Sequence, residues 1–294
     1  MFYIKRTLLL AIMAFIASCS GGGGGSVPVS GSIVKGPVNG ATVNIYAINA
    51  DGSRGVLQTT VATDVSGNWN AKVTVFPFEA VALGGTYNDE SSGVATTLSG
   101  SGISAIVPSG RTNIIVTPLT SAMADRAKKL AANGSALMQA ITTSETETTA
   151  ALGFNPASVI VPDPLNVPVN ATPQEKAYAK ILLGVSELVN KDPALAAAKA
   201  TGSLAAIMAV AADMLDGKLN SQDLNGNAIN VTGNTPVPLP VLGASGVSVV
   251  DTAATTLVTN KNLPNLATTT ITSTPTPTQT SNWGGFNWDG ATWN

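Results

Sequence analysis

Few side chains of this sequence can do covalent or redox chemistry. The chain contains no histidine and one cysteine, Cys19. Histidine is the commonest general base and the commonest metal ligand. Because the chain has none, Ser-His-Asp and Cys-His catalysis are excluded. One cysteine forms no intrachain disulfide, thiolate zinc site or iron–sulfur cluster. The sequence therefore predicts a protein that is not an enzyme and that holds no cofactor.

The densest group of oxygen ligands lies between residues 213 and 227. Its calcium candidates are Asp213, Asp216, Asp223 and Asn225. Ca²⁺ takes about six to eight oxygen ligands, and the EF-hand loop closes with a glutamate that is absent here. A helix that ends in a polar loop explains the stretch more simply. The prediction is no metal site, with these four residues as the candidates for calcium.

Two smaller groups of reactive side chains lie earlier in the chain. Asp89 and Glu90 are neighbours in an expected loop and offer oxygens for Ca²⁺, although acidic residues also occupy turns because they bond the local backbone. Ser32 and Lys35 have the spacing of a serine–lysine nucleophile pair. That pair needs a helix start, whereas residues three apart on a strand face opposite sides of the sheet. We expect neither group to be a site.

Three of the four tryptophans, Trp283, Trp288 and Trp293, lie at regular spacing in residues 282–294. Flat rings between Gly and Asn residues can stack on sugars or enter a groove of a partner. They can equally fold back and cover an exposed edge, because free aromatic rings in a tail promote aggregation. Both interpretations stay open.

The residues before Cys19 have the pattern of an export signal. Lys5 and Arg6 precede an apolar run from Leu8 to Ala17. The run is about half the roughly 20 residues that a transmembrane helix needs, so residues 1–18 are predicted to be a signal peptide.

The stretch Ile16-Ala17-Ser18-Cys19-Ser20 resembles the bacterial lipoprotein signal family. The resemblance implies cleavage before Cys19, which then becomes the N-terminus and carries covalent lipid such as palmitate. Ser20 stands where the family's inner-membrane retention signal usually has Asp, which implies the outer membrane. The alternative is an unmodified cysteine in an ordinary cleaved peptide. Residues 19–26, rich in glycine, are predicted to be a flexible tether.

The low charge of the chain argues against nucleic acid as a partner. The net charge is −2 and 11% of the residues are charged, so no basic surface for nucleic acid is predicted. The partners that we expect are the outer membrane, through the lipid anchor, and envelope proteins or glycans.

Residues 27–116 are typical of an all-β sandwich, because short β-prone runs alternate with turn residues. Strands are expected at 30–35, 42–48, 56–62, 68–75, 81–87, 96–98, 103–107 and 112–116. Apolar and polar residues alternate from Asn68 to Val75, which makes Trp69 a candidate for the core.

Turn and core residues of this region have a recognisable spacing. They are Gly31, Lys35-Gly36-Pro37-Val38, Gly40-Ala41-Thr42-Val43, Tyr46, Thr63-Asp64, Gly67 and Trp69. The pattern resembles the carboxypeptidase-regulatory-like, or transthyretin-like, module. The resemblance implies an immunoglobulin-like β-sandwich that serves as a non-catalytic structural or interaction domain, and it implies no ligand.

Residues 117–266 are predicted to be an α-helical domain. Thr117-Pro118 and the capping box Thr172-Pro173-Gln174-Glu175 are helix starts. Helices are expected over 118–132, 144–152, 173–190, 193–200, 204–215 and 249–258. Residues 267–294, a Thr/Pro-rich linker with a Trp-rich end, are predicted to be disordered. The fold class is thus α+β multidomain.

These predictions favour a non-catalytic surface lipoprotein that acts as an adhesion, scaffold or assembly module at the bacterial outer membrane. One alternative is a carbohydrate-binding or carbohydrate-active protein that uses the tail tryptophans. A further alternative is an accessory lipoprotein subunit of an envelope complex.

Overall fold

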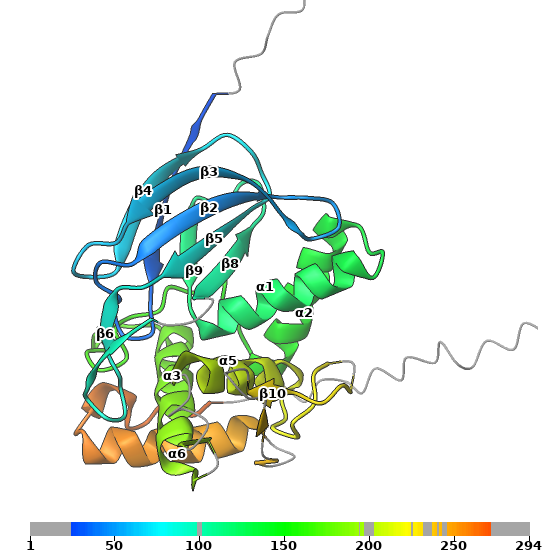
Figure 1. The fold of residues 1–294 in the computed structure, drawn as a ribbon. Coiled ribbons are helices and arrows are strands. Elements are labelled where there is room, and N and C mark those ends of the chain that lie inside the picture. The colour runs from blue at the N-terminus through cyan, green and yellow to red at the C-terminus, as the bar shows by residue number, and fades with distance from the viewer. Residues whose placement is uncertain are drawn as a thin grey trace, which may run out of the picture.

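A computed structural model describes residues 25–98, 102–193, 195–196, 203–224, 226–231, 237–239, 241–242 and 246–271. Strands and helices are both present, which confirms the α+β prediction. Strands gather in the N-terminal part and most helices in the part that follows (Figure 1). Cys19, Asn225 and the tail tryptophans lie outside the described residues, as does most of the expected helix over 193–200.

The N-terminal part contains two main sheets. Its strands are β1 (Val27–Ile33), β2 (Thr42–Ile48), β3 (Arg54–Ala62), β4 (Asn68–Val73), β5 (Phe78–Leu83), β6 (Thr86–Asn88), β7 (Ala95–Thr97), β8 (Ile103–Val107) and β9 (Asn113–Val116). One sheet has the order β4-β1-β9, with β1 and β9 parallel. The other has the order β3-β2-β5-β8 and is antiparallel, and β6 and β7 form a separate hairpin.

The two sheets pack face to face. Buried apolar side chains of both sheets, among them Ile45, Trp69 and Ile114, form one hydrophobic cluster. Trp69 is 2% exposed, so its prediction as a core residue is confirmed. The alternation of apolar and polar residues in β4 places Trp69 on the inner face of its sheet, as expected for a sandwich.

Two strands were predicted out of place. β1 spans Val27–Ile33, whereas the sequence suggested residues 30–35. β5 begins at Phe78 and ends at Leu83, whereas the sequence suggested residues 81–87. β5 pairs with β2 and β8 and is buried along nearly its whole length, so it shows no alternation that would mark its start. Gly84 and Gly85 follow with positive φ and turn the chain into β6.

The later part is mainly helical. Its elements are α1 (Pro118–Ala132), α2 (Leu137–Leu152), α3 (Pro173–Lys191), α5 (Ser203–Asp213), the 3₁₀ turns η1 (Met214–Asp216) and η2 (Pro264–Leu266), the short strands β10 (Asn230–Val231) and β11 (Val237–Pro238), and α6 (Gly246–Asn260). Gly184 lets α3 approach α6 closely, because a Cβ at this residue would stand 2.3 Å from the carbonyl oxygen of Val250. No helix in the described ranges is both long and apolar enough to span a membrane.

The predicted helix starts of α1 and α3 are confirmed. Thr117 and Thr172 are N-caps with complete capping boxes, and a proline follows each cap. These signals are local, because the cap side chain satisfies backbone N–H groups only three residues away.

The predicted start of α2 is wrong. The helix begins at Leu137 rather than Ser144, and it ends before Gly153 as expected. Ser144 is a buried mid-helix residue whose hydroxyl donates to the Met123 carbonyl of α1 at 2.8 Å. A serine that bonds the neighbouring helix resembles an N-cap in sequence, because the same hydroxyl serves both purposes.

Hydrophobic packing continues across residue 116. Ile48 and Ile106 of the sheets share one cluster with Ala124, Ala127 and Ile141 of the helices. Val34 and Ile115 belong to the main helical cluster. α1 lies along β8 (Figure 1). The division into domains at 27–116 and 117–266 remains a prediction.

Candidate functional site

The three calcium candidates that the structure describes, Asp213, Asp216 and Asp223, do not converge on one point. Asp213 accepts from the backbone N–H of Ser221 at 3.1 Å, and Asp216 accepts from that of Lys218 at 2.8 Å. Asp223 pairs with Lys129 of α1 at 2.5 Å and also accepts from Asn227. Within the described ranges, no group of three acidic, cysteine or histidine side chains is arranged to hold a metal ion.

Two of these carboxyl groups are electrostatically unusual. Burial raises the pKa of Asp213 to about 6, against the opposing effect of the Ser221 N–H and with a smaller contribution from Asp216. Burial also raises the pKa of Asp216. Both side chains organise the backbone of the loop after α5, which agrees with the simpler interpretation of this stretch.

The most unusual polar group is one that we term the Lys35 cluster: Lys35, Glu90 and Ser186. Lys35 follows β1, Glu90 lies in the β6–β7 loop and Ser186 in α3, and all three are fully buried. The Lys35 ammonium forms an ion pair with Glu90. It also donates to Ser186 Oγ at 2.6 Å, and that hydroxyl donates to Glu90 Oε2 at 2.8 Å. Each member thus contacts the other two.

The backbone brings Lys35 to the hairpin. Gly36 has φ +64, and a Cβ there would stand 2.9 Å from the Asn88 carbonyl oxygen. Only glycine adopts this conformation without strain and leaves room for the hairpin. The turn therefore holds Lys35 directly beneath the loop that carries Glu90.

Further polar contacts surround the Lys35 cluster. Asn190 of α3 donates to Asp89 Oδ1 at 3.0 Å, and Ser91 bonds Glu187. The Lys35 ammonium lies 5.4 Å from the centre of the Tyr87 ring, within range of a cation–π contact. Burial, with the nearby Glu90 and Asp89 carboxylates, raises the pKa of the Tyr87 hydroxyl. The hairpin is thus attached to α3 by a row of hydrogen bonds.

A second buried carboxylate links the sheet to α1. Glu79 of β5 is fully buried and bonds Arg54 of β3 at 2.6 Å and Lys128 of α1 at 2.5 Å. Burial opposes ionisation, but the two cations outweigh it and hold the pKa of Glu79 below its usual value. This carboxylate is a structural tie, since its cations come from another strand of the same sheet and from α1.

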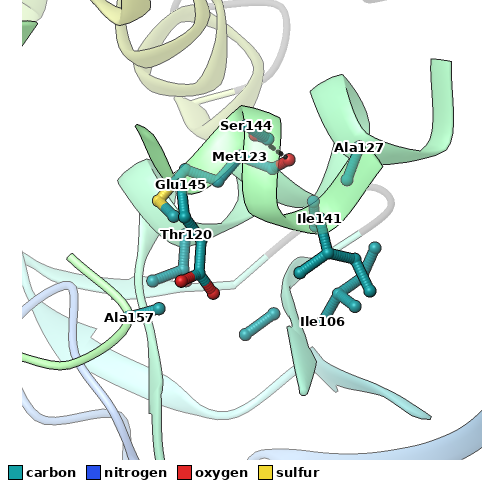
Figure 2. A pocket seen from close by; sticks show the side chains of 10 residues that line it. Ile106, Thr120, Met123, Ala127, Ile141, Ser144, Glu145 and Ala157 are labelled. Atoms are coloured by element: carbon teal, nitrogen blue, oxygen red, sulfur yellow. Dashed lines mark hydrogen bonds between the residues drawn. The ribbon is translucent and has the colours of Figure 1, made fainter. Parts of the chain in front are cut away.

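The enclosed cavity between β8, α1 and α2 is small. Figure 2 shows it lined by Ile106, Met123 and Ile141, with Glu145 at its edge. Its volume of about 20 Å³ admits roughly one water, whereas ligand pockets measure about 300–1,000 Å³. Glu145 is already paired with Arg111 at 2.9 Å. The cavity is therefore a packing gap.

No family model matches this chain, and no curated protein and no solved structure is similar enough to count as a match. The resemblance of residues 27–116 to the transthyretin-like module, and that of residues 16–20 to a lipoprotein signal, therefore stay predictions.

Sequence reasoning singled out Lys35 and Glu90 but did not join them, and it missed Ser186. Lys35 was paired with Ser32, and Glu90 with Asp89, because those neighbours are close in sequence. The true partners of Lys35 are 55 residues away, at Glu90, and 151 residues away, at Ser186. One signal was available: a lysine that directly follows the apolar end of β1 requires a counter-charge if it is buried.

Proposed function

We propose that this protein is a non-catalytic, lipid-anchored module of the bacterial cell envelope that serves in adhesion, scaffolding or assembly at the outer membrane. The observation that carries the proposal is the stretch from Ile16 to Ser20, with small residues before the only cysteine of the chain. The lack of histidine, the commonest general base, supports the non-catalytic part of the proposal.

The proposed anchor is a lipid on Cys19. One acyl chain gives marginal attachment and two give stable attachment, so a multiply acylated cysteine would hold the chain without a spanning helix. The glycine run from Gly21 to Gly25 would let the folded part stand away from the bilayer. Ser20, in place of Asp, favours the outer membrane over the inner membrane.

The fold supports a mechanical rather than a chemical role. Buried polar contacts at Glu90 and Glu79 attach the sheets to α3 and to α1. A scaffold must transmit position from its anchor to its partner, and elements joined by buried charge pairs resist relative movement. We therefore assign the sandwich, which we take to be transthyretin-like, the role of a rigid structural domain.

The test is metabolic labelling with radioactive palmitate in a bacterial host, followed by membrane fractionation. We expect the wild-type chain to carry label and to fractionate with the outer membrane, and the Cys19→Ala variant to carry none. Ser20→Asp is the matched control, because it should keep the label and move the protein to the inner membrane. An unlabelled wild-type chain would contradict the anchor.

A second candidate function is carbohydrate binding, favoured by the spacing of Trp283, Trp288 and Trp293. Each ring could stack on the apolar face of one sugar. A glycan array probed with the full chain and with a chain that ends at Thr280 tests it. Binding that disappears with the tail supports this function, and identical profiles remove it.

A further inference from the structure

Lys35 and Glu90 carry opposite charges at a place that water does not reach. Both side chains are 0% exposed. An ion pair in this environment bears a large desolvation cost that its mutual attraction recovers only if all its hydrogen-bonding atoms are satisfied. Glu90 Oε1 has no hydrogen-bond partner among the described residues. Nearby, the buried Tyr87 hydroxyl also has none there.

Ser186 lies where a proton relay would be needed. Its hydroxyl accepts from Lys35 Nζ at 2.6 Å, and its one hydrogen is within reach of Glu90 Oε2 at 2.8 Å and of the Leu182 carbonyl at 2.9 Å. A hydroxyl can accept and donate at once, so it can pass a proton from the nitrogen to the carboxyl oxygen without moving. The three groups come from separate elements, and the folded chain holds the Ser186 hydroxyl between the Lys35 nitrogen and the Glu90 oxygen.

We propose that Lys35 and Glu90 form an intramolecular amide bond, made by the folded protein itself, with Ser186 as the proton relay. The product replaces two buried charges with one neutral amide. Glu90 Oε1, the oxygen without a donor, becomes the amide carbonyl, for which a missing hydrogen bond costs less than for a carboxylate.

The step is balanced without a co-reactant. The Lys35 ammonium first gives a proton to Glu90 Oε2, which leaves a neutral amine and a neutral acid. Nζ then attacks Glu90 Cδ and forms the C–N bond. A proton of the nitrogen passes to Ser186 Oγ while the Ser186 proton passes to Oε2. The Cδ–Oε2 bond breaks, and one water molecule leaves.

A second lysine–carboxylate pair provides a natural comparison. Lys180 of α3 pairs with Asp251 of α6 at 2.8 Å, and Asp251 is partly exposed to solvent. Lys180 also donates to the Thr269 carbonyl at 2.6 Å, which is no proton relay. Solvated and without a bridging hydroxyl, this pair should remain an ion pair.

Peptide mapping of the full-length chain, purified in detergent from whole cells and then denatured, tests the proposal. Digestion with a lysine-specific protease should give a branched peptide that contains Lys35 and Glu90 and is lighter than the sum of its two arms by one water. Cleavage after Lys35 should be lost. Separate, unmodified Lys35 and Glu90 peptides from the folded wild-type protein would overturn the proposal.

Variants separate the reaction from the structure. Lys35→Arg keeps the charge and cannot condense, so its map should show no branch. Ser186→Ala should slow formation by about 10²-fold in newly made protein, and Ser186→Thr should restore it. Lys72→Arg, on the exposed side of β4, is the matched control and should leave the branch intact. A Ser186→Ala chain that cross-links at the wild-type rate would remove the relay. The wild-type map decides the amide alone, and it does not depend on the lipid anchor.

Discussion

The β6–β7 loop and the loop after α5 bury carboxylates in opposite ways. Glu90 lies against a lysine that follows β1 and a serine of α3, so its partners come from two distant elements. Asp213 lies against backbone N–H groups of its own loop. The first carboxylate joins elements to one another, whereas the second shapes one segment. Their removal should therefore damage the protein on different scales.

Loss of the lysine should have the largest effect. In Lys35→Met the Glu90 carboxylate stays buried without its cation and cannot form the proposed amide, which should lower the free energy of unfolding by at least about 3–5 kcal/mol. Urea unfolding followed by far-UV circular dichroism measures this. Lys72→Met on the exposed side of β4 is the control, expected within about 0.5 kcal/mol of wild type. Equal effects would show that the Lys35 cluster is not a tie.

The Asp213 carboxyl should give a pH dependence of stability. Its folded pKa, about 6, is above its unfolded value, so the folded state binds more protons between these values. The free energy of unfolding should therefore fall as the pH rises from about 4 to about 6, by up to about 3 kcal/mol. Asp213→Asn should flatten that fall.

The control is Asp51, a carboxyl group whose pKa is shifted in the opposite direction. Hydrogen bonds from Ser53 lower the pKa of Asp51, which is exposed. Asp51→Asn should therefore leave the fall between pH 4 and 6 in place. Urea titrations at several pH values measure both variants, and a wild-type curve that rises across this window would contradict the burial of Asp213.

The side-chain amide of Asn190 on α3 should contribute more to the free energy of unfolding than that of Asn227 in the loop after α5. Asn190 donates to Asp89 at 3.0 Å and to the Ser186 carbonyl at 2.9 Å, and it is partly buried. Asn190→Ala should cost about 1–2 kcal/mol. Asn227, which bonds Asp223 at an exposed place, is the matched control, and Asn227→Ala should cost under about 0.5 kcal/mol. A reversed order in urea unfolding would contradict the comparison.

The Asp223–Lys129 pair should have the smallest effect. Lys129 is half exposed, so Asp223→Asn should cost about 0.5 kcal/mol, and less at high salt. Melting temperatures at low and high ionic strength measure it. Because Asp223 faces Lys129, added Ca²⁺ should leave the melting temperature unchanged. A calcium-dependent rise that Asp223→Asn abolishes would instead establish a calcium site.

The sequence allowed local features to be predicted. Thr117 and Thr172 cap their helices because a side chain and a backbone N–H three residues away suffice. Trp69 was placed in the core by alternation along one strand. The start of α2 and the position of β5 were missed, because Ser144 bonds another helix and β5 is buried on both faces.

The Lys35 cluster could not be assembled from the sequence. Its three members are contributed by a turn, a loop and a helix. Lys35 and Glu90 each have a neighbour in sequence, Ser32 and Asp89, that offers a plausible role. Ser186 has no sequence feature that distinguishes it from the other serines, since its role depends on how α3 packs against the hairpin. Polar contacts at long range follow from the tertiary fold, which local patterns do not encode.

The difference between the two loops bears on the proposed scaffold. The flexible tether that we propose for residues 19–26 would carry the folded part as a single body only if that part moves as one unit. The hairpin and α3 are joined by the Lys35 cluster, and apolar clusters continue from the sheets into the helices. The sandwich and the helices should therefore unfold together, although each has the size of a separate domain.

Native-state hydrogen exchange of the full chain in low denaturant tests this claim most directly. Amides of β5 and of α3 should report the same opening free energy and the same dependence on denaturant, because one cooperative unit opens as a whole. In Lys35→Met the two sets should separate, with α3 and the β6–β7 hairpin exchanging first. Wild-type amides of β5 and α3 that already open at different free energies would contradict a single unit.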